Sequence, residues 1–91
     1  MKIQRKSVSN EQKTFTFDVN AREYLVKNLT DDDIMVCLGD SYDADESILI
    51  PSYCSQIVTE NIRDDTSEYL HDTLVVNCNG EGSVEVQCLE Y

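Results

Sequence analysis

Four cysteines and one histidine are the residues of this chain from which a zinc site or a thiol nucleophile could be built. Cys37, Cys54, Cys78 and Cys88 lie 17, 24 and 10 positions apart, so no Cys-x-x-Cys motif is present. Because His71 is the only histidine, a zinc ribbon or a Cys2His2 site cannot be assembled. We therefore expect four small buried thiols on β-strands, with one or two disulfides as the alternative.

Catalysis would depend on His71, whose imidazole is the one side chain with an ordinary pKa near neutral pH. A Cys–His or Ser–His–Asp arrangement through His71 is left open by the sequence. However, no Gly-x-Ser-x-Gly elbow is present, and the pattern places His71 in a loop before a strand that starts at Asp72. We expect no catalytic residues and no enzyme.

Carboxylates gather at two predicted turns, where they could bind a hard cation such as calcium. One run covers residues 31–33, and the other consists of Asp40, Asp43, Asp45 and Glu46. Counted from Asp43, the sixth position is Ile48 instead of glycine and the twelfth is Cys54 instead of glutamate, so the EF-hand pattern fails. We predict solvated turns without a metal or cofactor, with these four carboxylates as the alternative calcium ligands.

Three tyrosines, Tyr42, Tyr53 and Tyr69, occupy loop-like positions. Exposed aromatic rings could form a platform for a sugar, or they could cover the core and leave their hydroxyl groups in water. Both interpretations stay open at this point.

The 91 residues carry a formal net charge of −11, which argues against nucleic acid and anionic membranes as partners. An apolar run of the roughly 18 residues needed to span a membrane is also missing. The basic N-terminus is not followed by an apolar stretch, so we expect no signal peptide.

The charge is uneven, because residues 1–27 hold six of the seven Lys and Arg residues but three of the eighteen acidic residues. We predict a flexible basic arm over residues 1–13, ahead of a folded domain over residues 14–91. The candidate partner-binding residues of this arm are Lys2, Arg5, Lys6 and Lys13. The alternative is a solvated basic arm and an acidic surface that keeps a small protein soluble.

The rest of the chain alternates apolar and polar residues with a period of two, and it lacks any long stretch with a period of 3.6. The expected strands cover residues 14–19, 22–28, 33–38, 47–50, 56–62, 72–78 and 83–89. We predict an all-β protein with a single small antiparallel β-sandwich, Ig-like or jelly-roll-like, of about seven short strands.

The last two expected strands can pair with each other as a hairpin. With Val76 opposite Val86, residues 80–82 form a three-residue loop in which a glycine can adopt the left-handed conformation. This register separates Cys78 from Cys88 by roughly 13 Å, too far for a disulfide. We therefore predict a C-terminal hairpin without a bridge between these two cysteines.

Residues 24–39, 48–52 and 74–87 together resemble small structural proteins of tailed bacteriophages and of prophages in Gram-positive bacteria. The shared features are a V-x-N-x-T strand, an acidic loop, an I-x-I-P edge and a V-x-x-x-G-x-G-x-V-x-V ending. The resemblance implies a head decoration or fibre-type protein of the virion, made in the bacterial cytoplasm. It implies capsid or other virion proteins as partners, and no catalytic residues.

A virion role agrees with the physical features above, because symmetric assembly covers edge strands and multiplies weak contacts. We expect a homo-oligomer with a basic arm that binds a neighbouring subunit or the capsid. The alternative is a stand-alone glycan- or calcium-binding sandwich, which needs residues 39–47 and the tyrosine loops at one end of the domain.

Overall fold

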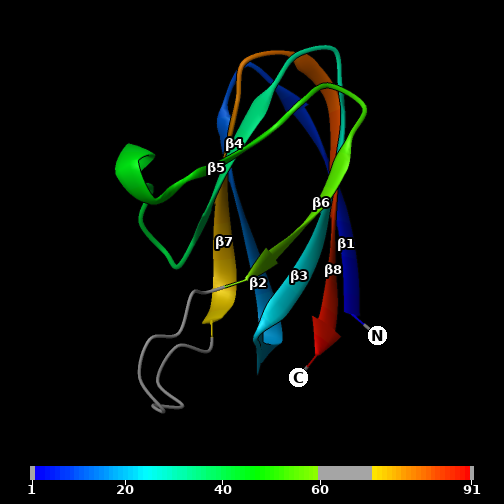
Figure 1. The fold of residues 1–91 in the computed structure, drawn as a ribbon. Coiled ribbons are helices and arrows are strands. Elements are labelled where there is room, and N and C mark those ends of the chain that lie inside the picture. Colours follow the sequence, from blue (N-terminus) through cyan, green and yellow to red (C-terminus); the bar gives the residue numbers. More distant parts are fainter. Residues whose placement is uncertain (1, 60–70, 91) are drawn as a thin grey trace.

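A computed structural model describes residues 2–59 and 71–90, which form two β-sheets packed face to face (Figure 1). Alternating sequences give strands because successive side chains point to opposite faces, one toward the core and one toward water. The elements are β1 (Lys2–Ser9), β2 (Gln12–Ala21), β3 (Glu23–Thr30), β4 (Ile34–Leu38), a 3-10 helix η1 (Ala44–Glu46), β5 (Ile48–Ile50), β6 (Ser55–Thr59), β7 (His71–Cys78) and β8 (Glu81–Glu90).

The strands are arranged four to a sheet, and every pair is antiparallel. Sheet A has the order β1-β8-β3-β6, and sheet B has the order β2-β7-β4-β5. The predicted all-β sandwich is therefore confirmed. Within the part of the chain that the structure describes, no helix is long and apolar enough to cross a membrane.

The N-terminal residues differ from the predicted flexible arm. Residues 2–9 form β1, which pairs with β8 from Lys2↔Cys88 to Ser9↔Glu81. The expected boundary at residue 13 falls inside β2. The polar composition of β1 suits the edge of a sheet, where one side of the strand lacks a neighbour. The described residues consequently contain eight strands instead of about seven.

The predicted C-terminal hairpin is wrong, because β7 and β8 belong to different sheets. Val76 lies opposite Lys13 and Val36, whereas Val86 lies opposite Gln4 and Val26. The predicted faces are nevertheless correct: alternate residues of each strand point into the core, in β7 Leu74, Val76 and Cys78, and in β8 Val84, Val86 and Cys88. Alternation along a strand does not distinguish a hairpin from an arch between sheets, because in both cases one face of each strand points into the core.

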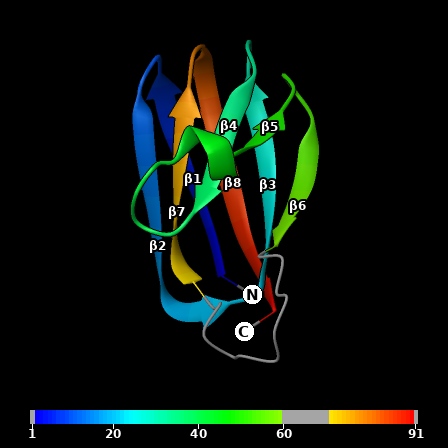
Figure 2. The same ribbon diagram turned by 60° about the vertical axis from the view of Figure 1, so that its left-hand side comes forward.

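Most connections cross from one sheet to the other. The turns after β1, β3, β5 and β7 all do so, and they gather at one end of the sandwich (Figures 1 and 2). We refer to this end as the arch end. Of the strands joined by described connections, only β4 and β5 pair with each other.

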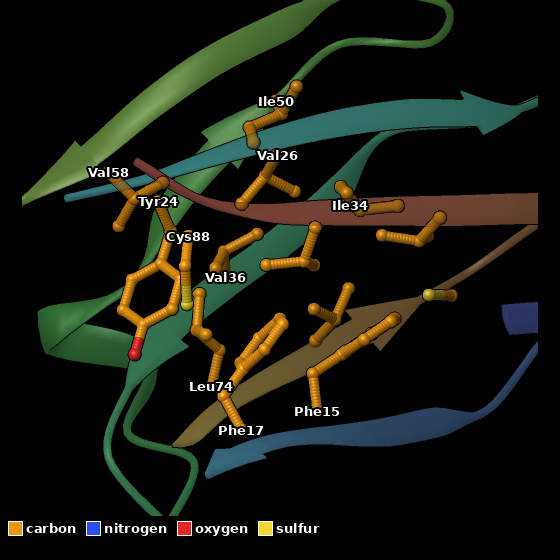
Figure 3. Close-up of a cluster of buried hydrophobic side chains, with 14 of the residues drawn as sticks. Phe15, Phe17, Tyr24, Val26, Ile34, Val36, Ile50, Val58, Leu74 and Cys88 are labelled. Carbon is orange, nitrogen blue, oxygen red and sulfur yellow. The ribbon is translucent and has the colours of Figure 1, made fainter. Parts of the chain in front are cut away.

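The core lies between the two sheets and is filled from both (Figure 3). Phe17 and Tyr24 pack with their ring centroids 5.6 Å apart, and Phe15 is fully buried beside them. The Tyr24 hydroxyl donates a hydrogen bond to the backbone carbonyl of His71, and burial raises the pKa of this phenol. This contact ties β3 of sheet A to β7 of sheet B.

Candidate functional site

The first acidic run, residues 31–33, takes part in hydrogen bonds at the arch end. The Asp31 carboxylate accepts a hydrogen bond from the Glu81 amide at 2.8 Å, and the Asp31 amide donates to the Glu81 carbonyl at 3.1 Å. Gly80 is required nearby, because a Cβ there would lie 2.2 Å from the Asp31 carboxylate oxygen. This run therefore joins the β3–β4 turn to the β7–β8 turn.

Asn28 organises the same end from inside, and its side chain is fully buried. Its amide nitrogen donates to the carbonyls of Asp32, Ile50 and Pro51 at 2.9–3.0 Å. Its amide oxygen accepts from the backbone and hydroxyl of Thr30. One side chain thus connects the β3–β4 and β5–β6 arches.

The second acidic group lies near η1, in the loop between β4 and β5. Asp43 caps η1 by accepting a hydrogen bond from the Asp45 amide at 3.0 Å. Asp43, Asp45 and Glu46 line a hollow of about 920 Å³, whereas Asp40 does not. Among residues 2–59 and 71–90, no three potential metal ligands converge on one point. Calcium binding by the four predicted carboxylates stays untested.

The tyrosines do not form a common platform in the described part of the chain. Tyr53 is 71% exposed in the arch between β5 and β6. Tyr42 is half-buried in the loop that leaves the opposite end of the sandwich after β4. Tyr69 lies outside the described residues. The arrangement that the glycan-binding alternative needs, with residues 39–47 and Tyr53 at one end, is not found.

All four cysteines are free thiols. Cys37, Cys78 and Cys88 are buried as expected, and burial raises the pKa of Cys78 to about 11. The expectation is wrong for Cys54, which is exposed because it lies in the turn just before β6. His71, expected in a loop, is the first residue of β7.

The four predicted partner-binding cations all contact groups of their own chain. Lys2 pairs with Asp18 at 3.0 Å, and Lys13 pairs with Glu11 at 3.3 Å. Arg5 contacts Glu85, as described below. Their binding of a partner stays a prediction, but each already has a role within the sandwich.

Side chains close the lateral side of the sandwich formed by β1 and β2. Lys6 Nζ donates to the Thr14 carbonyl at 2.7 Å, and Gln4 Nε2 donates to the Thr16 carbonyl at 2.6 Å. Both carbonyls belong to β2, the edge strand of sheet B. Polar side chains of β1 therefore occupy acceptors that an approaching strand would need. We call this the closed side.

Glu85 forms a buried charge on the outer face of sheet A. It lies opposite Arg5 on β1 and Lys27 on β3 and is 6% exposed. Arg5 Nη2 approaches its carboxylate at 2.6 Å and Lys27 Nζ at 3.4 Å, while Gln87 donates at 2.8 Å. The hydrogen bonds from Gln87 and Arg5, and then the charge of Lys27, lower the pKa of Glu85 to about 2.

In the part of the chain that the structure describes, the opposite lateral side, formed by β5 and β6, shows no comparable closure. Among the described residues, no side-chain hydrogen bond or ion pair joins β5 to β6, and no further strand pairs with β6. Of the large apolar side chains exposed among the described residues, Leu49 at 49%, Tyr53 at 71% and Ile57 at 52% lie along it, whereas Ile3 at 54% lies on β1. Figure 2 shows β5 and β6 along one margin of the molecule. We call this the open side.

Sequence reasoning placed Ile57 on the face opposite Val58, as observed, but it missed the difference between the two lateral sides. One signal was available. Lys2, Gln4 and Lys6 recur with a period of two, which is typical of an edge strand whose inward side chains are polar. No such regularity marks Glu85 or its partners.

No protein-family model, curated protein or solved structure matches this chain.

Proposed function

We propose that this chain is a non-enzymatic structural protein of a tailed bacteriophage or prophage particle, attached to capsid or other virion proteins along its open side. The single observation that supports attachment there is the contrast between the lateral sides. The closed side uses its own Lys6 and Gln4 side chains to occupy edge carbonyls, whereas on the open side no described strand pairs with the outer edge of β6, beside the exposed Ile57.

A free edge strand presents backbone donors and acceptors that one strand of a partner can satisfy. Leu49 and Ile57 lie on the outer faces of sheets B and A next to this edge, where a partner would remove both from water. Because each side chain is already about half buried, its complete burial contributes about 1 kcal/mol. Repetition around a symmetric particle multiplies a contact of this size. The particle itself is proposed from the sequence resemblance.

The test compares purified particles from phage that carry either the wild-type gene or one of two variants. Ile57→Lys places a charge on the open side. Thr14→Lys introduces the same charged side chain at an exposed position of β2 on the closed side. We expect about tenfold fewer copies per particle for Ile57→Lys, equivalent to about 1.4 kcal/mol of attachment, and wild-type occupancy for Thr14→Lys. Quantitative mass spectrometry of gradient-purified particles measures the copies.

The two parts of the proposal fail in different ways. Equal occupancy of both variants contradicts attachment through the open side. Absence of the wild-type protein from the particles contradicts the virion function itself.

A further inference from the structure

The N-terminal strand β1 is attached to the rest of the sandwich differently from the other strands. Its backbone pairs only with β8, over eight residue pairs from Lys2↔Cys88 to Ser9↔Glu81. It leads into β2 through residues 10–11, and β2 belongs to the other sheet. Figure 1 shows β1 at the margin beside β8. Displacing β1 would therefore break one ladder and leave the pairing of β2 with β7 intact.

Little apolar surface holds β1 in place. Val8 is its only buried side chain, and Ile3 is 54% exposed. The strand instead makes polar contacts, from Lys6 and Gln4 to carbonyls of β2 and from Arg5 to Glu85. By contrast β8, its neighbour, buries three apolar side chains in the core. A β1 strand from an identical chain could make all the same contacts.

The hinge between β1 and β2 is short and contains a left-handed residue. Asn10 has φ +47°, and its amide donates to the Gly80 carbonyl at 2.9 Å. The Glu11 carboxylate accepts from the Ser9 amide at 3.0 Å. Extending this hinge would relieve the positive φ and direct β1 away from its own β8. Short, constrained hinges are where identical chains exchange elements at low cost.

From these observations we propose that β1 is an exchangeable strand, which can leave its own chain and complete sheet A of a second copy, reciprocally, in a dimer. The partner is a second copy of this chain, because the recognition elements are the β8 ladder, the Glu85 carboxylate and the β2 carbonyls. The inference does not depend on the proposed virion function.

Opposite charges at positions 5 and 85 provide the test. Arg5→Glu alone sets two carboxylates side by side, and Glu85→Arg alone gathers three cations with Lys27, in the closed monomer and in an exchanged homodimer alike. An exchanged heterodimer of the two variants restores an opposite pair at both β1–β8 contacts. We expect co-refolded equimolar chains to give a heterodimer in native mass spectrometry at a concentration where each variant alone is monomeric. A mixture that contains only the two monomers overturns the proposal.

A second comparison uses the hinge, in case the charge variants do not fold. Asn10→Val places a β-branched residue at φ +47°, which disfavours the closed hinge, and we expect the dimer fraction to rise about tenfold, a shift of about 1.4 kcal/mol. Tyr53→Val is the matched control, because Tyr53 has φ +58° in the β5–β6 arch, away from β1. The proposal is overturned if Asn10→Val keeps the wild-type dimer fraction or if Tyr53→Val raises it equally.

Discussion

Asn28 shows how much of the sandwich depends on a single polar side chain. Asn28→Ala leaves the carbonyls of Ile50 and Pro51, which lie at the arch end, without the amide that donates hydrogen bonds to them. We expect the free energy of unfolding to fall by about 3 kcal/mol, measured by urea denaturation. Asn20→Ala, at an exposed position of β2, is the control and should change it by less than about 0.5 kcal/mol. Equal losses would contradict the role of Asn28.

Glu85 contributes to the pH dependence of stability, together with Glu11 and Asp18, whose pKa values are also lowered by hydrogen bonds. Its folded pKa of about 2 lies below the ordinary value of 4.5, so its stabilisation is complete above pH 4.5 and is lost as the pH falls from 4.5 toward 2. Glu85→Gln should therefore be less stable than wild type at pH 7 and should lose less stability across that range. Glu46→Gln, which removes an exposed glutamate of η1, should keep the wild-type slope. Thermal unfolding at several pH values distinguishes the two, and identical slopes for all three chains would refute the assignment.

At the scale of elements, the close approach of β8 to β3 requires Gly82. This residue has φ +147°, and a Cβ would lie 2.3 Å from the Leu29 carbonyl oxygen. We expect Gly82→Ala to lower the free energy of unfolding by about 3 kcal/mol. Gly39→Ala is matched in backbone conformation at φ +104°, but its Cβ would meet nothing nearer than His71 Nδ1 at 4.0 Å. It should cost only about 1 kcal/mol in the same urea titration, and equal costs would show that the contact with β3 is unimportant.

The elements also show where the sequence is informative. Residues 14–19 and 72–78 were placed on strands with the correct buried faces, because alternation along one strand is a local property. The pairing of β7 with β8 was wrong, because the choice between a hairpin and an arch depends on which strands compete for each edge. Val76 gains Val36 and Lys13 as neighbours, and neither is close to it in sequence.

The candidate site, like the strand pairing, depends on contacts between residues that are far apart in the sequence. The charge distribution predicts Lys2, Arg5 and Lys6 to be partner-binding cations. Their contacts with Asp18, Glu85 and Thr14 join segments up to 80 positions apart, so no local pattern could reveal them. The open side was missed for a similar reason, because the strand order of a whole sheet decides which strand lies at its edge.

Over the whole molecule, charged and apolar side chains are distributed unevenly on the surface. The net charge of −11 opposes contact between the acidic surfaces of identical chains, while Lys2 and Lys6 contact β2 on the closed side and Arg5 contacts Glu85 on the outer face of sheet A. The open side instead offers neutral and apolar residues, Ser55 to Thr59 among them. This distribution suits attachment to a different protein along one side, with reciprocal exchange of β1 as a separate route to pairing with a second copy.

The most direct test of the proposed function is the location of the protein in a lysate of its bacterial strain after prophage induction. Gold-labelled antibody to this chain would be imaged with the particles by electron microscopy. A virion component should place gold on intact particles, on capsids for a decoration protein and on tails for a fibre-type protein. Particles without gold, in a lysate whose soluble fraction contains the protein, would contradict the proposed function.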